Sequence, residues 1–262
     1  MNAERLLDAP RAPLLSVRGI SCSFGGVRAV ADVSFSAPAG QITGLIGPNG
    51  AGKSTTLGIV AGFIRPSAGT IQFAGRDITK LPNHRRARLG MIRTFQMRGE
   101  FDRLTVLENL LVAAPGQRGE KIRSIYSVRR TWRQQQRELV DQARDLLDRF
   151  GILDHENVYA EELSGGQRRL MELARALMAK PRLLLLDEPM AGVSPAMRDR
   201  LGAHLLEVAD SGIGIVLVEH QLRFVEDVCG HVLVLAQGTV IGEGKMSALR
   251  EQAAVLDAYL TG

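Results

Sequence analysis

Three short, compact and mainly apolar runs mark the chain: residues 41–46, 183–186 and 213–218. Strands buried on both faces, as in a parallel sheet, have continuous apolar runs rather than alternating ones. A helical pattern follows each run: residues 53–62, 195–210 and 222–228. Alternating buried strands and helices predict an α/β fold built around a parallel sheet.

The ends of the chain have a different pattern. Segments 14–20, 33–37 and 70–73 are short and separated by turn residues, so we expect a mixed β-subdomain near the N-terminus. Residues 232–236 and 240–241 predict a strand pair near the C-terminus. A single helix is expected over the tail, residues 247–260.

The middle of the chain is predicted to be a helical insertion, roughly residues 97–177. Apolar residues recur at helical spacing over 106–114 and again at Leu139, Ala143, Leu146, Leu147 and Phe150. Between these stretches, residues 118–137 are basic and polar. We interpret this basic segment as a solvated helix face, with contact to lipid headgroups as the alternative.

Composition limits the class of protein. The chain has 262 residues, 45% hydrophobic and 23% charged, as an ordinary soluble globular protein has. No apolar run approaches the roughly 18 residues of a membrane-spanning helix, and residues 1–15 lack the apolar core of a signal peptide. Cys22 and Cys229 form neither a metal-ligand spacing nor a disulfide framework, which fits a reducing cytoplasm.

The net charge of +5 suits an anionic partner such as a nucleotide, a membrane surface or nucleic acid, although spread over the chain it has little weight. Aromatic residues make up only 5% of the chain. A stacking platform for single-stranded nucleic acid is therefore not expected.

A phosphate-binding loop follows the first apolar run. The motif G-x-x-x-x-G-K-S is formed by Gly47, Pro48, Asn49, Gly50, Ala51, Gly52, Lys53 and Ser54. Its glycines let backbone N–H groups face an anion at a helix N-terminus. We expect Lys53 to reach the β- and γ-phosphates of a nucleotide, Ser54 to ligate Mg²⁺, and Thr55 to lie near the α-phosphate.

Two acids end the second apolar run. In proteins with a phosphate-binding loop, a strand-end aspartate such as Asp187 holds Mg²⁺ through its water shell. The adjacent Glu188 is the candidate general base for the attacking water. Consecutive side chains point in different directions at a strand end, so the two acids can have different roles.

Residues Leu163, Ser164, Gly165, Gly166 and Gln167 complete the pattern. Alone, they would be a helix start capped by Ser164. Together with the two nucleotide motifs, they resemble the signature of the ABC ATPase family. The resemblance implies a P-loop fold with a RecA-like core, an antiparallel β-subdomain and a helical signature subdomain. It also implies a head-to-tail dimer in which this helix N-terminus binds the γ-phosphate of ATP held by the other subunit.

Further family landmarks can be placed on the sequence. By this resemblance, Gln96 contacts Mg²⁺ and the attacking water, His220 contacts the γ-phosphate, and Phe24 stacks on adenine. Residues 191–195 occupy the position of the loop that crosses the dimer interface but depart from its usual S-x-L-D form. The implied domain covers 14–262, with a core and β-subdomain at 14–96 and 178–245, a helical subdomain at 97–177 and a C-terminal helix at 246–262.

Residues 104–110, 187–195 and 258–260 are similar to the ATPase subunits of branched-chain amino-acid importers. This similarity implies transmembrane permease partners, a homodimer or a heterodimer with a related ATPase, an indirect link to a substrate-binding protein, and a peripheral position on the cytoplasmic face of the inner membrane. A lipid or lipopolysaccharide exporter remains an alternative within transport. A soluble relative acting on nucleic acid or the ribosome is disfavoured, because such proteins usually carry two cassettes or a long coiled-coil insertion.

Overall fold

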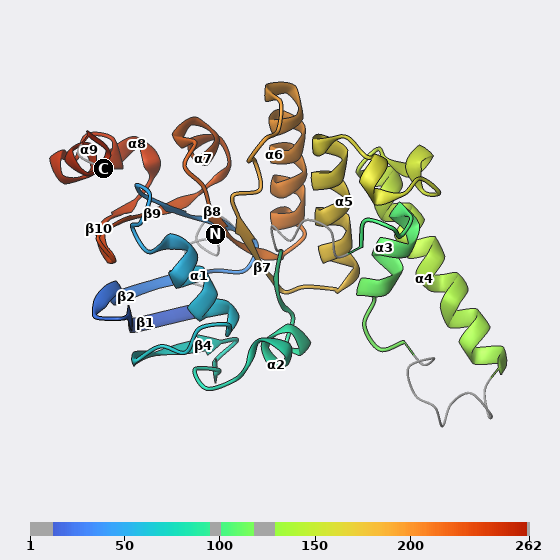
Figure 1. Ribbon diagram of the computed structural model, residues 1–262, viewed down its shortest axis with the longest axis horizontal. Helices are drawn as coiled ribbons and strands as arrows, with labels where there is room; N and C mark the ends of the chain where they lie inside the picture. The colour runs from blue at the N-terminus through green and yellow to red at the C-terminus, as the bar shows by residue number, and fades with distance from the viewer. Residues whose placement is uncertain (1–12, 95–100, 118–128, 261–262) are drawn as a thin grey trace, which may run out of the picture.

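The computed structural model describes residues 13–94, 101–117 and 129–260, which form two sheets and a set of surrounding helices (Figure 1). The strands are β1 (Leu15–Phe24), β2 (Val27–Ala37), β3 (Ile42–Ile46), β4 (Ala68–Phe73), β5 (Arg76–Asp77), β6 (Met91–Arg93), β7 (Leu183–Asp187), β8 (Gly214–Val218), β9 (His231–Ala236) and β10 (Thr239–Gly244). The helices are α1 (Lys53–Ala61), α2 (Asn83–Arg88), α3 (Val106–Ala113), α4 (Arg129–Arg149), α5 (Gly165–Met178), α6 (Pro195–Asp210), α7 (Leu222–Val228), α8 (Met246–Leu249) and α9 (Ala253–Leu260).

The central sheet has the strand order β10-β9-β3-β8-β7-β6. Its strands from β9 to β6 pair in parallel, and β10 pairs antiparallel with β9 at one edge. The three apolar runs of the sequence are its inner strands β3, β7 and β8, as predicted. Since β8 separates β3 from β7, the chain must cross over between them, and the loops after β3 and β7 emerge at the same edge.

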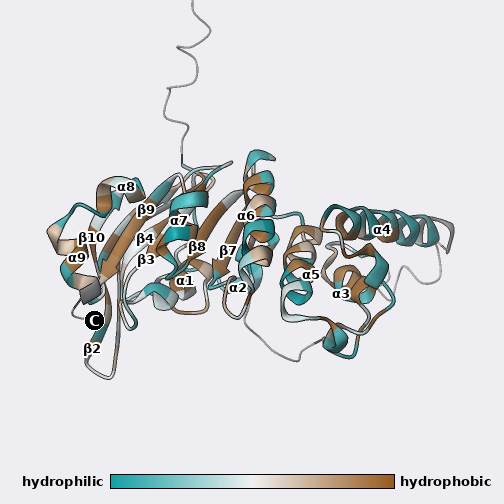
Figure 2. Cartoon of the chain, turned by 90° about the horizontal axis from the view of Figure 1, so that it is seen from above, coloured by the Kyte–Doolittle hydropathy of each residue, from teal (hydrophilic) through white to brown (hydrophobic). Residues whose placement is uncertain are grey.

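Alternate residues of the central strands enter two different cores. Leu183 and Leu185 pack with α1 and the smaller sheet, whereas Leu184 and Leu186 pack with α5, α6 and α7. This division follows from the two-residue period of a strand and explains why the whole run is apolar. In Figure 2 these strands form a brown band between helices.

The smaller sheet is antiparallel, with the order β2-β1-β4-β5. Its long hairpin β1–β2 turns at Gly25 and Gly26, where the sequence predicted a turn. The strands are longer than expected from the sequence, because β1 continues to Phe24 through irregular register near Gly19, where φ is +60°. The inner face of this sheet packs on the core that contains α1.

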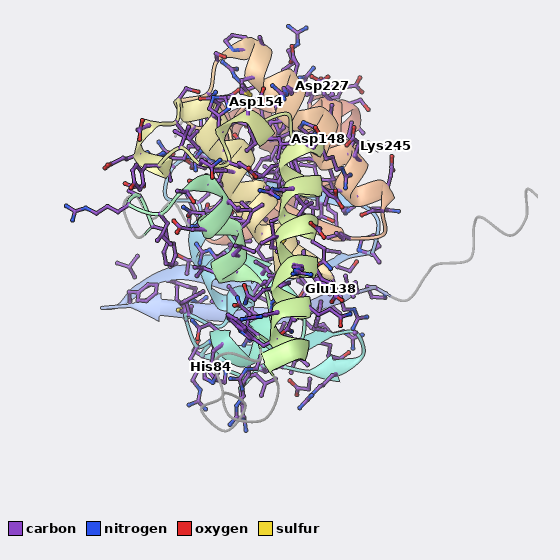
Figure 3. The ribbon with its side chains drawn as sticks, turned by 90° about the vertical axis from the view of Figure 1, so that its right-hand side faces the viewer. His84, Glu138, Asp148, Asp154, Asp227 and Lys245 are labelled. Atoms are coloured by element: carbon purple, nitrogen blue, oxygen red, sulfur yellow. The ribbon has the colours of Figure 1, made fainter. Side chains whose placement is uncertain are left out.

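Helices α3, α4 and α5 form a separate lobe beside α6 (Figure 1). The predicted stripe is confirmed: Leu139, Ala143 and Leu147 of α4 and Phe150 just after it are buried, and Leu146 is partly buried against the same core. Figure 3, seen from this end, shows α4 along the outer face with Glu138 and Asp148 on it. Of the basic segment, residues 118–128 lie outside the described residues, and Arg133 and Arg137 are exposed.

The single tail helix expected over residues 247–260 is wrong. The tail forms α8 and α9, separated at residues 250–252. Leu249 and Val255 are both buried, and both side chains pack over Gly242 of β10. At about 100° per residue, one continuous helix would place these two residues on different sides, so burying both requires the break.

Helix α2 was not predicted, and its Arg86 is almost completely buried. The guanidinium donates to the carbonyls of Ile59 and Val60, at 2.8 and 2.6 Å, and to those of Leu81 and Thr79. Arg86 thus donates to carbonyls in the last turn of α1, where that of Ile59 also accepts from the backbone N–H of Gly62. Burial lowers the pKa of Arg86 to about 10.

Across the described parts of the chain, no helix combines the length and the apolar character needed to cross a membrane.

Candidate nucleotide-binding site

The loop between β3 and α1 depends on glycine at fixed points. Gly47, Gly50 and Gly52 have φ of 146°, 78° and 96°, in a region that other residues rarely adopt. A Cβ at Gly47 would overlap the carbonyl oxygen of Leu235, and one at Gly52 would overlap that of Ala29. The loop therefore lies tightly against neighbouring strands and leads directly into the N-terminus of α1, a position suited to an anion.

Lys53 opens α1 with its side chain buried. Its Nζ donates to the carbonyls of Gly47 and Pro48 at 2.7 and 2.8 Å, so the ammonium curls back over the loop. Burial lowers the pKa of Lys53, while the nearby carboxylates of Glu188 and Asp187 raise it. The ammonium is thus positioned over the loop, where a phosphate would bind.

Ser54 and Asp187 meet at this edge of the sheet. The Ser54 hydroxyl donates to Asp187 Oδ1 at 3.3 Å, across a sequence separation of 133 residues. The other carboxylate oxygen, Oδ2, accepts from Arg93 at 2.8 Å. Hydroxyl and carboxylate oxygens are the donors that Mg²⁺ prefers, so this pair fits a magnesium ion that also touches a nucleotide. Arg93 was not predicted; no motif marks it.

Glu188 follows with an unusual backbone. Its φ is +47°, and its N–H donates to the carbonyl of Val218 at 2.9 Å. A residue with a Cβ rarely adopts this left-handed conformation, which costs about 1–3 kcal/mol. Such strain concentrates at functional sites, which supports a role for Glu188.

The end of β8 is held by Glu219, which sequence reasoning did not single out. Its carboxylate is completely buried and accepts from the backbone N–H of Met190 at 3.0 Å and from that of His220 at 3.2 Å. It therefore ties the loop after β7 to the end of β8. The side chain of His220 remains half exposed. The signal in the sequence was an acid placed directly after an apolar run, as at Asp187.

The signature segment begins α5 with a reciprocal cap. Ser164 Oγ accepts from the backbone N–H of Gln167, whose side-chain oxygen accepts from the backbone N–H of Ser164. The Gln167 amide also donates to His155 Nε2 at 2.9 Å. The helix start predicted from Ser164 is thus present. Gly165 and Gly166 lie in the first turn, and Gly165 is exposed.

The residues around this helix start tie it to α3 and the loop before it. Arg168 donates to Asp102 at 2.6 Å, and Arg175 donates to the buried Asn109 at 3.3 Å and lies over the ring of Phe101. These contacts were not predicted. They link the signature helix to the segment that follows Gln96.

Other predicted site residues are not brought into contact. Gln96 lies outside the described residues. Phe24 ends β1 and is half exposed, as a ring available for stacking would be. Thr55 is partly buried in the first turn of α1.

Ser164 lies at the start of α5 in the helical lobe, and Figure 1 places β7 and α6 between α5 and α1. One chain therefore does not bring its signature to its own phosphate loop.

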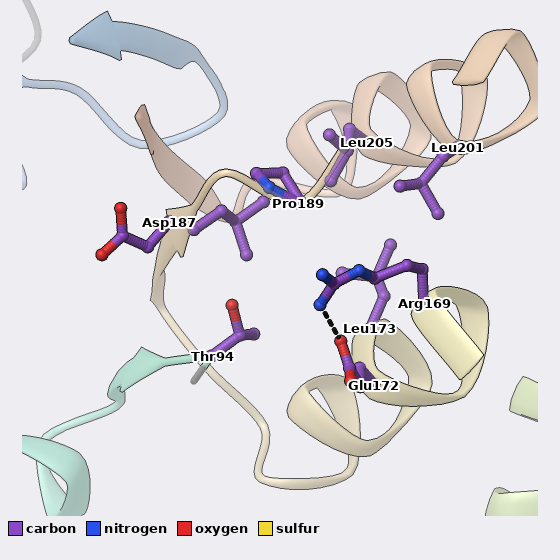
Figure 4. A pocket seen from close by; sticks show the side chains of 9 residues that line it. Thr94, Arg169, Glu172, Leu173, Asp187, Pro189, Leu201 and Leu205 are labelled. Carbon is purple, nitrogen blue, oxygen red and sulfur yellow. Dashed lines mark hydrogen bonds and ion pairs between the residues drawn. The ribbon is translucent and has the colours of Figure 1, made fainter. Parts of the chain in front are cut away.

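A pocket between α5 and α6 reaches the end of β7 (Figure 4). Asp187 and Thr94 line one side, Leu201 and Leu205 of α6 another, and the Arg169–Glu172 ion pair of α5 a third. It separates the strand end from the helical lobe and is distinct from the phosphate loop.

A glycine loop between a buried parallel strand and a helix, with a strand-end carboxylate facing the helix serine, defines a P-loop nucleoside triphosphatase. The ABC transporter family model matches residues 30–191, and the chain belongs to the ABC transporter family as an ATP-binding cassette and ATPase. This assignment confirms the family resemblance found in the sequence.

Relatives match over nearly the whole chain. It is 40% identical to the probable branched-chain amino acid transport ATP-binding protein LivG of Archaeoglobus fulgidus, over 94% of this chain and 95% of that protein. Identity to the high-affinity branched-chain amino acid transport ATP-binding protein LivG of Escherichia coli is 37%, over 95% and 98%. A nucleotide-free ATP-binding cassette from an ABC transporter superposes with a TM-score of 0.84 at 32% identity, covering 96% of this chain and all of that one. The ADP conformation of the cassette MJ1267 gives the same values.

Proposed function

We propose that this protein is the ATP-hydrolysing, energy-coupling subunit of an ABC importer for branched-chain or related amino acids. The observation that carries the proposal is the 3.3 Å hydrogen bond from Ser54 Oγ to Asp187 Oδ1, beside the strained backbone of Glu188. The substrate class is supported by the similarity to LivG proteins over nearly full length.

In the proposed mechanism, the backbone N–H groups of residues 47–52 and the ammonium of Lys53 bind the β- and γ-phosphates of ATP. Ser54, Asp187 and Gln96 would hold Mg²⁺, which when bound would neutralise phosphate charge. Glu188 accepts the proton of the attacking water. His220 contacts the γ-phosphate from the end of β8, and Phe24 stacks on the adenine.

The partner subunit supplies Ser164, Gly165, Gly166 and Gln167 to complete the site, because the signature of one chain is displaced from its own loop. ATP binding closes the dimer and hydrolysis reopens it. Movement is passed to permease subunits at the cytoplasmic face of the membrane, and an external binding protein delivers the amino acid. The domain boundaries at 96–97, 177–178 and 245–246 define the units that move.

The Glu188→Gln variant tests the assigned base. It keeps the size and the left-handed backbone but cannot accept a proton, so we expect tight ATP binding, turnover reduced roughly 100-fold or more, and an ATP-dependent dimer in size-exclusion chromatography. Glu243→Gln, an exposed acid on β10, is the control. Wild-type turnover by Glu188→Gln would refute the assignment.

The transport assignment is tested by purifying the tagged chain from its native cells in mild detergent and identifying its partners. Two polytopic membrane proteins with a second, related ATPase are expected. Membrane proteins without a second ATPase would indicate a homodimeric transporter instead, and ribosomal partners alone would refute transport.

A further inference from the structure

Arg93 and Ser54 contact different oxygens of the Asp187 carboxylate. Arg93 is the last residue of β6, and its register partner on β7 is Leu185, two residues before Asp187. Its guanidinium lies 2.8 Å from Oδ2, while Ser54 lies 3.3 Å from Oδ1. One oxygen thus faces a fixed positive charge of the protein, and the other faces the position of the expected ion.

The surroundings strengthen this ion pair. The side chains of Arg93 and Asp187 are only 16% and 13% exposed, so water screens their interaction weakly. The Arg93 guanidinium also lies 5.8 Å from the centre of the Phe63 ring. Lys53, the neighbouring cation, directs its Nζ to the carbonyls of Gly47 and Pro48. Arg93 is therefore a cation in direct contact with the strand-end carboxylate.

We propose that Arg93 is a positioning residue that neutralises Asp187 before Mg²⁺ arrives and weakens the hold of the site on the ion. This inference rests on the proposed assignment of Asp187 to Mg²⁺. A guanidinium bound to Oδ2 repels a dication near Oδ1, because both are positively charged and water screens them weakly in this site. It also fixes the carboxylate with Oδ1 toward Ser54. Charge and orientation have opposite effects on Mg²⁺, and the charge dominates because the ion is divalent.

The test is a titration of MgCl₂ against binding of a fluorescent ATP analogue to the purified chain. Arg93→Gln removes the charge but keeps a donor, so the Mg²⁺ concentration at half-saturation is expected to fall roughly threefold or more. Arg93→Lys keeps the charge and is expected to stay close to wild type. Arg85→Gln, an exposed arginine on α2, is the control and leaves the titration unchanged. An unchanged or raised Mg²⁺ requirement in Arg93→Gln would overturn the inference.

A second readout uses no nucleotide and no metal. Arg93→Gln and Asp187→Asn each break the same ion pair, so each is expected to lower the Tm of the chain in EDTA. The double variant is expected to lose no more than the larger single loss, because coupled residues are not additive. Additive losses would overturn the inference, since they would mean that the pair is not coupled.

Failure of the inference and failure of the proposed function give different results. If Asp187→Asn leaves the Mg²⁺ titration unchanged, Asp187 does not serve the ion and the proposed function loses its metal residue. If Asp187→Asn raises the Mg²⁺ requirement while Arg93→Gln does not lower it, the function stands and the role of Arg93 is refuted.

Discussion

The hydroxyl of Ser54 lies 3.3 Å from the carboxylate of Asp187, although 133 residues separate them in the sequence. The parallel strands β3, β8 and β7 bring them together by ending at the same edge of the sheet. A site formed by strand ends inherits the rigidity of the sheet, so the two oxygens are held in place before any ligand binds.

Changing either side chain is expected to weaken Mg²⁺ binding and so raise the Mg²⁺ concentration that nucleotide binding requires. For Ser54→Ala and Asp187→Asn we expect a Mg²⁺ requirement raised roughly tenfold or more, because the first removes a hydroxyl ligand and the second removes the negative charge that attracts the ion and its water shell. Isothermal titration with ATP at several Mg²⁺ concentrations measures this. Ser247→Ala, an exposed serine of α8, is the matched control. Unaltered titrations for both variants would contradict the proposed metal site.

Glycine at position 188 is expected to raise the stability of the chain while abolishing its turnover. Glu188→Gly relieves the left-handed backbone, so the chain gains about 1 kcal/mol, a rise in Tm of roughly 2–3 °C. The same variant has no carboxylate to accept a proton and is expected to lose turnover. Differential scanning calorimetry and phosphate release measure the two effects. A lower Tm than wild type would show that the carboxylate stabilises the turn more than the strain destabilises it.

His204 is expected to make stability depend on pH. It is packed on Phe150 with ring centres 4.6 Å apart, and burial lowers its pKa despite the opposing effect of Glu207. The folded state therefore favours the neutral ring. Between the ordinary pKa near 6.5 and the lowered value, the unfolded chain binds more protons than the folded chain, so stability falls as pH falls through this window.

The His204→Leu variant tests this dependence, because it fills a similar volume without a titrating group. Urea unfolding at about pH 8 and about pH 5 should show a smaller loss in the variant than in wild type. His84→Asn, an exposed histidine of α2, serves as the control. Equal losses in wild type and His204→Leu would assign the acid sensitivity to other groups.

Arg86 is expected to matter for stability more than its neighbours. Arg86→Met keeps the bulk but removes the guanidinium that donates to carbonyls of α1 and of the loop before α2. We expect a loss of about 3 kcal/mol or more, measured by urea unfolding, and weaker ATP binding because α1 carries the phosphate loop. Arg85→Met, on the same helix but exposed, should lose little. Similar losses for both variants would rule out the capping role.

The central strands were predictable because both of their faces are buried, which leaves an uninterrupted apolar signal in Leu183–Asp187 and Gly214–Val218. Helix α2 was not predictable in the same way. Its sequence is polar and basic, and the burial of Arg86 depends on carbonyls at Ile59 and Val60, far away in the chain. The break between α8 and α9 likewise depends on packing against Gly242, which no local pattern contains.

Within the site, the sequence predicted the residues that belong to motifs but not the residues that support them. Lys53, Ser54 and Asp187 are marked by spacing and by neighbouring glycines or strands. Arg93 contacts a carboxylate of β7, and Glu219 contacts the backbone of Met190 in the loop after β7. These contacts exist only after the sheet has formed. The role of Gln96 stays a prediction, since it lies outside the described residues.

The buried carboxylate of Glu219 has a consequence for how fast His220 can respond. This carboxylate accepts from the backbone N–H of Met190 in the loop after β7 and from that of its own neighbour His220, so separating the two segments breaks the hydrogen bond to Met190. The half-exposed imidazole can change its side-chain torsions without breaking this hydrogen bond. Rotamer changes of this kind take picoseconds to nanoseconds, whereas loop motions take nanoseconds to microseconds. The His220 side chain would then reorient on the arrival or loss of a phosphate faster than the chain around it can rearrange.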